Sequence, residues 1–379
     1  KGVRMSTPFP PFRADQVGSL LRPAYLLDAR EEFATGKIDA AALREIENRA
    51  IADVVKKQEA VGLCSISDGE FRRSYFHLDF FQHLEGVTVT GNINASSDAQ
   101  QQVGWTPPKL SVTGKLGHKY PISLSDYEFL KTQTQGMIKI TMPSPTMLHF
   151  RGGRAGIDAK TYPDLEEFFS DLAQVYREEI EALYQAGCRS IQLDDTNLAY
   201  LCDPKMRADA AARGEDPNTL PALYARIINA AIKHDHKDLT IGIHLCRGNH
   251  RGAWFASGGY EPVADVLFNS LDVNSYYLEF DDERSGDFSP LRFVPANKFV
   301  VLGLVSSKIG ELVETRDSIL TRLDEAAKYM PKNNMGLSPQ CGFSSTSHGN
   351  NITEEQQWNK LRFVVEVAKE AWGTAGSAR

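Results

Sequence analysis

The chain has 379 residues, of which 42% are hydrophobic, and a formal net charge of -7 without a long run of either sign. A chain of this length and composition buries a large core and is long enough for one large α/β barrel or two ordinary domains. The acidic balance argues against nucleic-acid binding and against attachment to an anionic membrane surface, because both need clustered basic residues. We therefore expect a local pocket for a small neutral or anionic molecule.

The sequence contains no run of roughly 18 apolar residues and no signal-peptide pattern, so we expect a cytoplasmic protein. Residues 1–11 are expected to be an N-terminal tail, in which the residues before Met5 are an artificial extension. The five cysteines are an odd number and lack the dense spacing of a disulfide scaffold, which predicts reduced thiols. Three of them are expected to be packed or incidental: Cys64, Cys188 and Cys202.

Eight strand-like runs rich in β-branched residues recur along the chain, and amphipathic stretches separate most of them. The predicted strands cover residues 14–18, 64–68, 137–142, 189–194, 239–245, 272–278, 299–305 and 335–338. The predicted helices cover residues 40–61, 164–186, 219–234, 261–270, 316–330 and 353–372. This alternation predicts a (β/α)8 barrel. A doubly wound open sheet is the alternative, but no glycine-rich turn follows the first strand to support it.

One region breaks the alternation. Residues 85–135 contain two alternating Val/Thr runs separated by a polar loop with prolines, which predicts a β-hairpin inserted after the second strand. We expect this insertion to cap one face of the barrel. The predicted organisation is a single catalytic domain over residues 12–372, followed by a flexible tail over residues 373–379.

The ends of the predicted strands carry residues with metal-binding chemistry, and in this architecture the strand ends build the active site. His244 and Cys246 are two apart, so their side chains point to the same side. Glu279 ends the next strand, and Cys341 follows the last one. One imidazole, two thiolates and one carboxylate suit tetrahedral Zn²⁺ and suit neither Mg²⁺ nor Ca²⁺.

This donor set also predicts a type of reaction. Two thiolates and a carboxylate on a divalent ion leave a negative cluster, which makes the zinc a poor Lewis acid toward water. A sulfur bound to such a zinc stays a thiolate at neutral pH and is nucleophilic. The pattern therefore favours alkyl transfer to a thiol. A closed structural zinc site is the alternative, but the short C-x-x-C motifs typical of such sites are missing.

Several short motifs together resemble one known family. "VGSL", "SDGEFRR", "IQLDDTNL", the His-x-Cys pair, "YLEFDDERS" and "SPQCGF" occur in this order. Over residues 12–372 the chain resembles the catalytic domain of cobalamin-independent methionine synthase, and most of all its short single-domain members. The resemblance implies a zinc-dependent methyltransferase that converts homocysteine to methionine, with a folate such as 5-methyltetrahydrofolate or a methyl-corrinoid as methyl donor.

The resemblance also assigns roles to individual residues. The four residues of the predicted zinc site match the zinc ligands of the family: His244, Cys246, Glu279 and Cys341. Ser19, Glu70 and Asp194 match positions that hold the amino-acid substrate, the first through its carboxylate and the two acids through its ammonium. An ammonium group is well bound by paired carboxylates, and a carboxylate by N–H and hydroxyl groups.

The chain departs from the family at three points that concern the methyl donor. The full-length enzymes have an additional N-terminal barrel that helps to bind the polyglutamyl folate, and 379 residues leave no room for it. Phe150 in "SPTMLHF" stands where the family has a tryptophan that stacks on the folate. Lys308 in "GLVSSK" stands where the family has a histidine that can protonate the leaving group, so Lys308 is the candidate general acid.

Structural explanations remain open for several of these residues. Asp195 is a candidate helix cap, Ser19 a turn former, Lys308 a solvated lysine, and Glu70 a member of a salt-bridged loop with its two following arginines.

Three other functions remain as alternatives to the methyltransferase. One is a zinc thiol alkyltransferase of the epoxyalkane:coenzyme M type, whose substrate has a sulfonate and no ammonium. Another is a non-catalytic protein that binds zinc or thiols. The third is a metal-free barrel that resembles uroporphyrinogen decarboxylase and needs an arginine-lined pocket, for which the candidates are Arg13, Arg22, Arg72 and Arg73.

Overall fold

The computed structural model describes residues 10–92, 108–249, 252 and 255–378. Its centre is a six-stranded parallel sheet in the order β10-β9-β8-β7-β6-β5, so strands that are neighbours in the sheet are consecutive in the sequence. The strands are β5 (Ile140–Pro143), β6 (Ser190–Asp195), β7 (Thr240–Leu245), β8 (Ser275–Glu279), β9 (Phe299–Val305) and β10 (Met335–Pro339). All their residues are buried, as expected for parallel strands that are covered on both faces.

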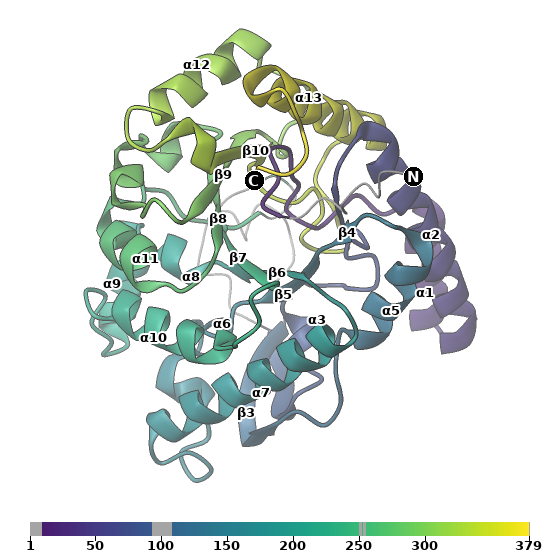
Figure 1. Ribbon diagram of the computed structural model, residues 1–379. Coiled ribbons are helices and arrows are strands. Elements are labelled where there is room, and N and C mark those ends of the chain that lie inside the picture. Colours follow the sequence, from purple (N-terminus) through teal and green to yellow (C-terminus); the bar gives the residue numbers. More distant parts are fainter. Residues whose placement is uncertain (1–9, 93–107, 250–251, 253–254, 379) are drawn as a thin grey trace.

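A second parallel pair continues this arrangement. β1 (Ser65–Ile66) pairs with β4 (Met137–Ile138), which directly precedes β5 in the chain. The predicted strand over residues 137–142 is therefore split into two short strands. Figure 1 shows the strands in the middle of the molecule and the helices around the outside.

The predicted first strand over residues 14–18 is reduced to one parallel bridge, between Ala14 and Leu337 in β10. Gly18 has a φ of +141°, a conformation that L side chains rarely adopt, so regular strand geometry ends there. The Ser67 hydroxyl donates a hydrogen bond of 2.7 Å to the Gly18 carbonyl. The N-terminal segment thus contacts both β10 and the chain after β1, which makes the arrangement barrel-like.

Six of the predicted amphipathic segments form helices close to the predicted positions. They are α2 (Ala40–Val61), α7 (Leu165–Gln185), α10 (Leu220–Ile232), α11 (Ala264–Ser270), α12 (Arg316–Ala326) and α13 (Glu354–Trp372). In α7 the buried residues recur three or four positions apart, which places them on one face toward the sheet. No helix in the described part of the chain is long and apolar enough to span a membrane.

The sequence patterns did not predict six further helices. The structure adds α1 (Ala24–Ala34), α3 (Leu78–Phe81), α5 (Leu124–Gln133), α6 (Met147–Phe150), α8 (Asn197–Tyr200) and α9 (Pro204–Ala212). Short 3₁₀ turns are η1 (Gly153–Gly156), η2 (Glu261–Val263), η3 (Glu283–Ser285), η4 (Ser289–Phe293) and η5 (Lys332–Asn334). Helices this short bury few apolar residues, so their periodic pattern is weak.

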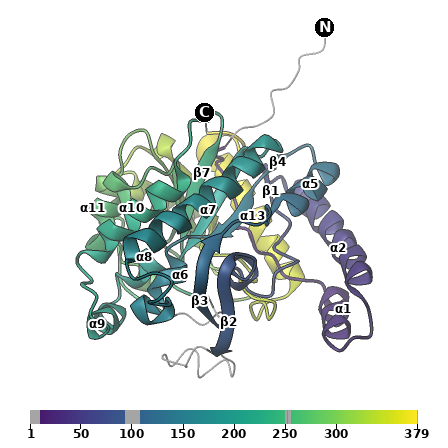
Figure 2. The same cartoon turned by 90° about the horizontal axis from the view of Figure 1, so that it is seen from below.

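The predicted insertion is an antiparallel pair of strands followed by a helix. β2 (Glu85–Asn92) pairs with β3 (Pro108–Gly117), and β3 contacts α7; the residues between the two strands lie outside the described part. Figure 2 shows this pair at the edge of the molecule. The predicted boundary at residue 135 is wrong, because helix α5 occupies residues 124–133 and buries Tyr127 and Leu130 against its neighbours.

The two chain ends pair with each other, contrary to the predicted tails. Phe12 and Ser377 form an antiparallel bridge. The N–H of Arg13 donates to the carbonyl of Gly376 at 2.9 Å, and the N–H of Ala378 donates to the carbonyl of Pro11 at the same distance. The prediction of a tail outside the fold is therefore wrong for residues 375–378. Residues 1–9, including the predicted extension before Met5, and residue 379 lie outside the described residues.

Candidate metal centre and substrate cavity

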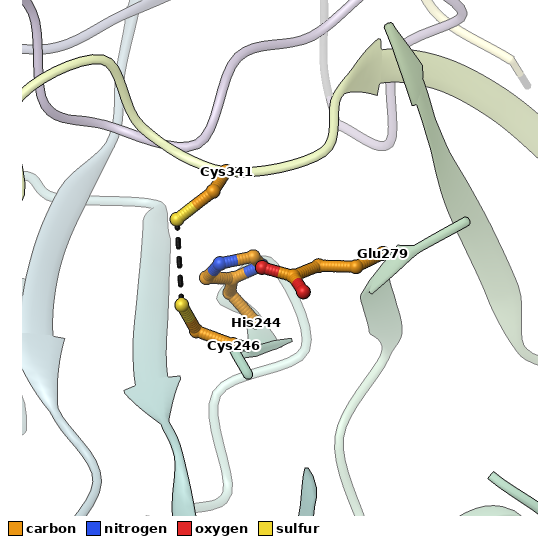
Figure 3. Close-up of side chains that lie close together, drawn as sticks. All are labelled: His244, Cys246, Glu279 and Cys341. Atoms are coloured by element: carbon orange, nitrogen blue, oxygen red, sulfur yellow. Dashed lines mark hydrogen bonds between the residues drawn. The ribbon is translucent and has the colours of Figure 1, made fainter. Parts of the chain in front are cut away.

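The four predicted zinc ligands meet at the carboxyl ends of three strands. His244 lies in β7 with Cys246 just after it, Glu279 is the last residue of β8, and Cys341 follows β10. All four are buried, and one potential ligand atom from each lies within 4.8 Å of the others. The Sγ atoms of Cys246 and Cys341 are 3.4 Å apart. Figure 3 shows the four side chains directed toward one another.

The imidazole of His244 presents a free nitrogen to this cluster. Its Nδ1 lies 3.1 Å from the backbone carbonyl of Tyr277, and a carbonyl only accepts, so Nδ1 carries the hydrogen. Its Nε2 is buried and has no hydrogen-bond partner among the described residues. A buried nitrogen with an unused lone pair costs free energy unless a ligand satisfies it, and a metal ion does so.

Arg247 holds Glu279 in place. The backbone N–H of Arg247 donates to Glu279 Oε2 at 3.3 Å, and its guanidinium donates to the Glu279 carbonyl at 3.1 Å. This guanidinium is fully buried and also binds the Gly258 carbonyl. Burial and the nearby Cys341 sulfur raise the pKa of Glu279 to about 7, and the positive charge of Arg247 opposes that rise.

The two thiols lie within hydrogen-bond distance of each other, with their Sγ atoms 3.4 Å apart. A hydrogen bond from Cys246 and the neighbouring His244 lower the pKa of Cys341 well below its usual value, whereas the same contact raises the pKa of Cys246. Burial lowers the pKa of His244, but the neighbouring Cys341 sulfur outweighs burial and raises this pKa to about 9. One nitrogen, two sulfurs and one carboxylate fit the donor preferences of Zn²⁺, and binding of the ion would release the protons on these groups.

The cavity beside this cluster is lined by the three residues that were predicted to hold the substrate: Ser19, Glu70 and Asp194. Glu70 is buried and has a φ of 60°, which is unusual for a residue other than glycine. Its N–H donates to Asp68 Oδ1 at 2.8 Å, and its Oε1 accepts from the Thr141 hydroxyl at 2.9 Å. The tight turn thus aims this carboxylate at the cavity.

Glu70 and Asp194 are two buried acids, and the nearby charge of Arg73 only partly offsets the effect of burial on the pKa of each. Arg73 Nη1 lies 3.8 Å from Glu70 Oε2, beyond hydrogen-bond distance. Burial and the charge of Glu70 raise the pKa of Asp194 to about 7, and burial also raises the pKa of Glu70. Two such carboxylates are stabilised by a cation that enters the cavity.

Ser19 fits against the loop that carries Cys341. Its hydroxyl oxygen accepts from the N–H of Ser344 at 3.3 Å, and its carbonyl accepts from the N–H of Phe343 at 3.0 Å. A Cβ atom at Gly342 would lie 1.9 Å from the Ser19 hydroxyl oxygen, so this position requires glycine. The hydroxyl of Ser19 is therefore held at the cavity by a close backbone contact.

The structure does not bring Lys308 into the cavity. Its Nζ lies 2.6 Å from Asp281 Oδ2 and 3.2 Å from Asp282 Oδ2, and it is not among the lining residues. Burial lowers the pKa of Lys308, but Asp281 and Glu279 raise it above its usual value overall, so the ammonium holds its proton firmly. This position and these ion pairs do not support Lys308 as the general acid. The sequence alone did not show that two acidic residues bind it.

Two other residues singled out in the sequence have structural contacts. Phe150 is buried, with its ring centroid 6.1 Å from those of Tyr200 and Tyr224, and it does not line the cavity. Asp195 Oδ1 accepts from the N–H of Leu198 at 2.9 Å, in the first turn of α8. The alternative of a helix-capping role is thus confirmed for Asp195.

The arginines of the decarboxylase alternative are bound elsewhere. Arg13 donates to the Met335 carbonyl, Arg22 to the Glu70 carbonyl, Arg72 to Asn48 Oδ1 and Arg73 to the Thr141 carbonyl. None of the four lines the cavity within the described part of the chain. The arginine-lined pocket that this alternative needs is not present there.

The sequence analysis missed three residues around the site. Arg247 stands next to Cys246 in the chain, and its position one residue after a ligand was the available signal. Arg151 and Tyr200 line the cavity and follow the short helices after β5 and β6. Because they lie several residues beyond the strand ends, a search limited to the strand ends overlooks them.

The chain also matches known proteins. The family model described as "Cobalamin-independent synthase, Catalytic domain" matches residues 12–370. A Bacillus subtilis (strain 168) protein, "Uncharacterized protein YxjH", is 46% identical over 364 residues, with 96% of this chain and 95% of the relative covered. A "Methionine synthase" from Pyrococcus abyssi (strain GE5 / Orsay) is 25% identical over 356 residues, with 93% and 92% covered.

A solved structure is similar over the same length. The crystal structure of the "Putative Vitamin-B12 Independent Methionine Synthase" from Listeria monocytogenes matches with a TM-score of 0.78 and 40% identity. The match covers 96% of this chain and 99% of the other. The fold is thus a parallel α/β fold that matches this solved structure. The chain belongs to the family of the cobalamin-independent synthase catalytic domain.

Proposed function

We propose that this protein is a zinc-dependent methyltransferase that converts homocysteine to methionine. One observation carries the proposal: three members of the donor cluster, His244, Cys246 and Cys341, line the same cavity as the buried acid pair of Glu70 and Asp194. Homocysteine has a thiol for the cluster and an ammonium for the acids. The relative from Pyrococcus abyssi, which is named as a methionine synthase, supports this assignment.

Each part of the substrate has a partner in the chain. The zinc ligands are the imidazole Nε2, the two cysteine sulfurs and the Glu279 carboxylate. When bound, the zinc supplies the charge that keeps the substrate sulfur a thiolate at neutral pH. Glu70 and Asp194 bind the ammonium, and the Ser19 hydroxyl binds the carboxylate. Arg247 positions Glu279 through its two hydrogen bonds.

The reaction balances as a displacement. The thiol proton is released to solvent, the substrate sulfur forms a bond to the methyl carbon, and the bond between this carbon and the donor breaks. The electron pair of that bond stays with the donor, a folate or a methyl-corrinoid, and the nitrogen of a folate donor then takes up a proton from solvent. The residues of the chain hold the sulfur and the amino acid so that the methyl group can approach in line.

We also propose that the strands close into a complete (β/α)8 barrel. The bridge from Ala14 to Leu337 and the hydrogen bond from Ser67 to Gly18 support a closed ring in which residues 14–18 take the place of the first strand. A crystal structure tests the closure, and separation of residues 14–18 from β10 or from Ser67 would contradict it.

The metal centre is tested by zinc content and zinc-edge X-ray absorption of the purified protein, with and without homocysteine. We expect bound zinc with two sulfur ligands, and a third sulfur after homocysteine is added. The Cys246→Ser variant should show one sulfur fewer. An unchanged sulfur count with homocysteine would indicate a structural zinc, and absence of zinc would overturn the proposal.

The acid pair is tested by comparing two thiols. Glu70→Gln and Asp194→Asn should weaken homocysteine binding about 10- to 100-fold, the usual effect of losing a hydrogen bond to a charged group. Neither change should weaken binding of coenzyme M, which has no ammonium. Asp238→Asn, at an ion pair with Arg189 on the surface and away from the cavity, is the control. If both acid variants bind homocysteine normally, the epoxyalkane:coenzyme M type of reaction is favoured.

A further inference from the structure

Arg151 is a cation in the cavity that nothing above has used. It follows α6, it is half-buried, and it lines the same cavity as the donor cluster. Its guanidinium forms no hydrogen bond or ion pair with the described residues, in contrast to Arg22, Arg73 and Arg247, which each bind several groups. A guanidinium has five donors in a planar fork, and burial without a partner is costly. Such a group fits an anion that arrives with a ligand.

Tyr200 extends the surroundings of Arg151. It is buried and also lines the cavity. A Cβ atom at Gly248, two residues after Cys246, would meet the Tyr200 hydroxyl at 3.0 Å, so this hydroxyl lies near the Cys246 side of the donor cluster. The rings of Tyr200 and of Phe150, the residue before Arg151, have centroids 6.1 Å apart, and Arg151 and Tyr200 line the same cavity. Burial raises the pKa of Tyr200. The phenol therefore keeps its proton and can donate a hydrogen bond.

Arg151 lies in a different part of the cavity from Ser19, the group assigned to the substrate carboxylate. Ser19 is held against the loop after β10 by Phe343 and Ser344. Arg151 comes after β5, whose neighbour in the sheet is β6. Strand β1, which precedes Glu70, lies between the segment that carries Ser19 and the strand that precedes Arg151. Both polar ends of the amino acid thus have partners without Arg151.

We propose that Arg151, with Tyr200 beside it, binds a negatively charged group of the methyl donor. This inference rests on the proposed function and specifies its second substrate. The donor then belongs to an anionic class with a carboxylate or phosphate group, which a guanidinium binds through charge-assisted hydrogen bonds. Sulfonium compounds carry a positive charge on the sulfur that holds the methyl group, and Arg151 disfavours them by repulsion.

The test compares three methyl donors of different charge with the zinc-loaded full chain. 5-Methyltetrahydrofolate carries carboxylates, methylcobalamin carries a phosphodiester, and S-methylmethionine carries a sulfonium. We expect Arg151→Gln to lower kcat/KM for the anionic donor that the protein uses about 10- to 100-fold, mainly through KM. Arg151→Lys keeps the charge and should retain part of the activity. S-Methylmethionine should be a poor donor and should gain from Arg151→Gln.

The control for these variants is Arg226→Gln, which removes an exposed arginine from α10 on the outside of the molecule. A loss of kcat/KM with 5-methyltetrahydrofolate would show that Arg151 binds a carboxylate, and a loss with methylcobalamin would show that it binds a phosphate. The inference is overturned if Arg151→Gln leaves kcat/KM within twofold, if neither anionic donor is used, or if the sulfonium is the best donor.

Homocysteine binding is measured separately, so that the two proposals can fail independently. The zinc sulfur count with homocysteine should be the same in Arg151→Gln as in the unchanged protein. If the unchanged protein gains no third sulfur, the proposed function itself fails. If the unchanged protein does gain a third sulfur but kcat/KM for the donors is the same in Arg151→Gln, only the inference about the donor is wrong.

Discussion

Each reactive side chain of the site forms a hydrogen bond that fixes its orientation, and another of its polar atoms faces the donor cluster or the cavity. The Tyr277 carbonyl fixes Nδ1 of His244, Arg247 fixes Glu279, and Thr141 fixes Glu70. Such contacts set the orientation of a ligand, and their loss typically weakens metal binding or activity. The free ends meet at the cavity, where they are available to the metal and the substrate.

Gly342 tests how closely Ser19 must approach the loop after β10. In Gly342→Ala the new methyl group would lie 1.9 Å from the Ser19 hydroxyl oxygen, so the hydroxyl must move. We expect the KM for homocysteine to rise about tenfold, because one hydrogen bond to the charged carboxylate is weakened. Zinc content should be unchanged, since Ser19 is not a ligand.

The matched control is Gly156→Ala, because a Cβ atom there meets nothing within 4 Å. It should bind homocysteine normally. Equal KM values for the two variants would show that Ser19 does not contact the substrate carboxylate.

His149 makes stability depend on pH. Burial and, to a lesser extent, Arg213 lower the pKa of His149 to about 4, against 6.5 for an ordinary histidine, while Nδ1 lies 2.9 Å from the Tyr224 hydroxyl. The unfolded chain therefore takes up the proton first as the pH falls. The free energy of unfolding should decrease between pH 6.5 and pH 4, by about 3 kcal/mol at most.

Urea denaturation of the unchanged protein and of His149→Gln at several pH values checks this expectation. Glutamine can still bond to Tyr224 but does not titrate, so the variant should lose less stability as the pH falls. Parallel curves for the two proteins would contradict the assignment of this pH dependence to His149.

At the scale of elements, the parallel strands and the longer helices were predictable from local pattern. β9 occupies residues 299–305 and α2 residues 40–61, both as predicted. The predictions for residues 14–18 and for the residues of helix α5 were wrong for different reasons. Residues 14–18 pair with β10 at one point only, and the residues of α5 were taken as part of the hairpin insertion. Both outcomes depend on neighbours that are distant in sequence.

Helix α13 offers a test of local capping. The Thr353 hydroxyl accepts from the N–H of Gln356 at 3.2 Å, and Gln356 Oε1 accepts from the N–H of Thr353 at 2.8 Å. Thr353→Ala should lower the free energy of unfolding by about 1 kcal/mol, because it breaks this capping box. Thr132→Ala, at an exposed position inside α5, is the control and should be neutral or slightly stabilising.

Urea denaturation at fixed zinc concentration measures both threonine variants. Homocysteine affinity should stay the same in both, because neither residue lines the cavity. A loss of stability in Thr132→Ala as large as in Thr353→Ala would rule out the capping explanation.

At the scale of the whole molecule, the two chain ends close the fold together. Ala375 is buried, and three backbone hydrogen bonds join residues 11–14 to residues 375–378: Arg13 to Gly376, Ala14 to Ala375, and Ala378 to Pro11. Deletion of residues 375–379 should lower the free energy of unfolding by about 3 kcal/mol, at about 1 kcal/mol for each bond. Thermal denaturation measures the change.

Deletion of Arg379 alone is the control for this truncation, and it should leave the melting temperature unchanged. The longer truncation should still bind zinc, because none of the ligands contacts this segment through a hydrogen bond. An unchanged melting temperature after the longer deletion would show that the pairing of the termini adds no stability.

The sequence by itself determined the α/β class of fold, the order of the central strands and the four residues that meet at the candidate metal centre. Periodicity reports which side of an element is buried, and parallel strands place their carboxyl ends at one edge. Only the tertiary structure decided that Lys308 is bound to Asp281, that Arg151 enters the cavity unpaired and that the termini pair. These depend on contacts between segments far apart in the chain, which local pattern does not encode.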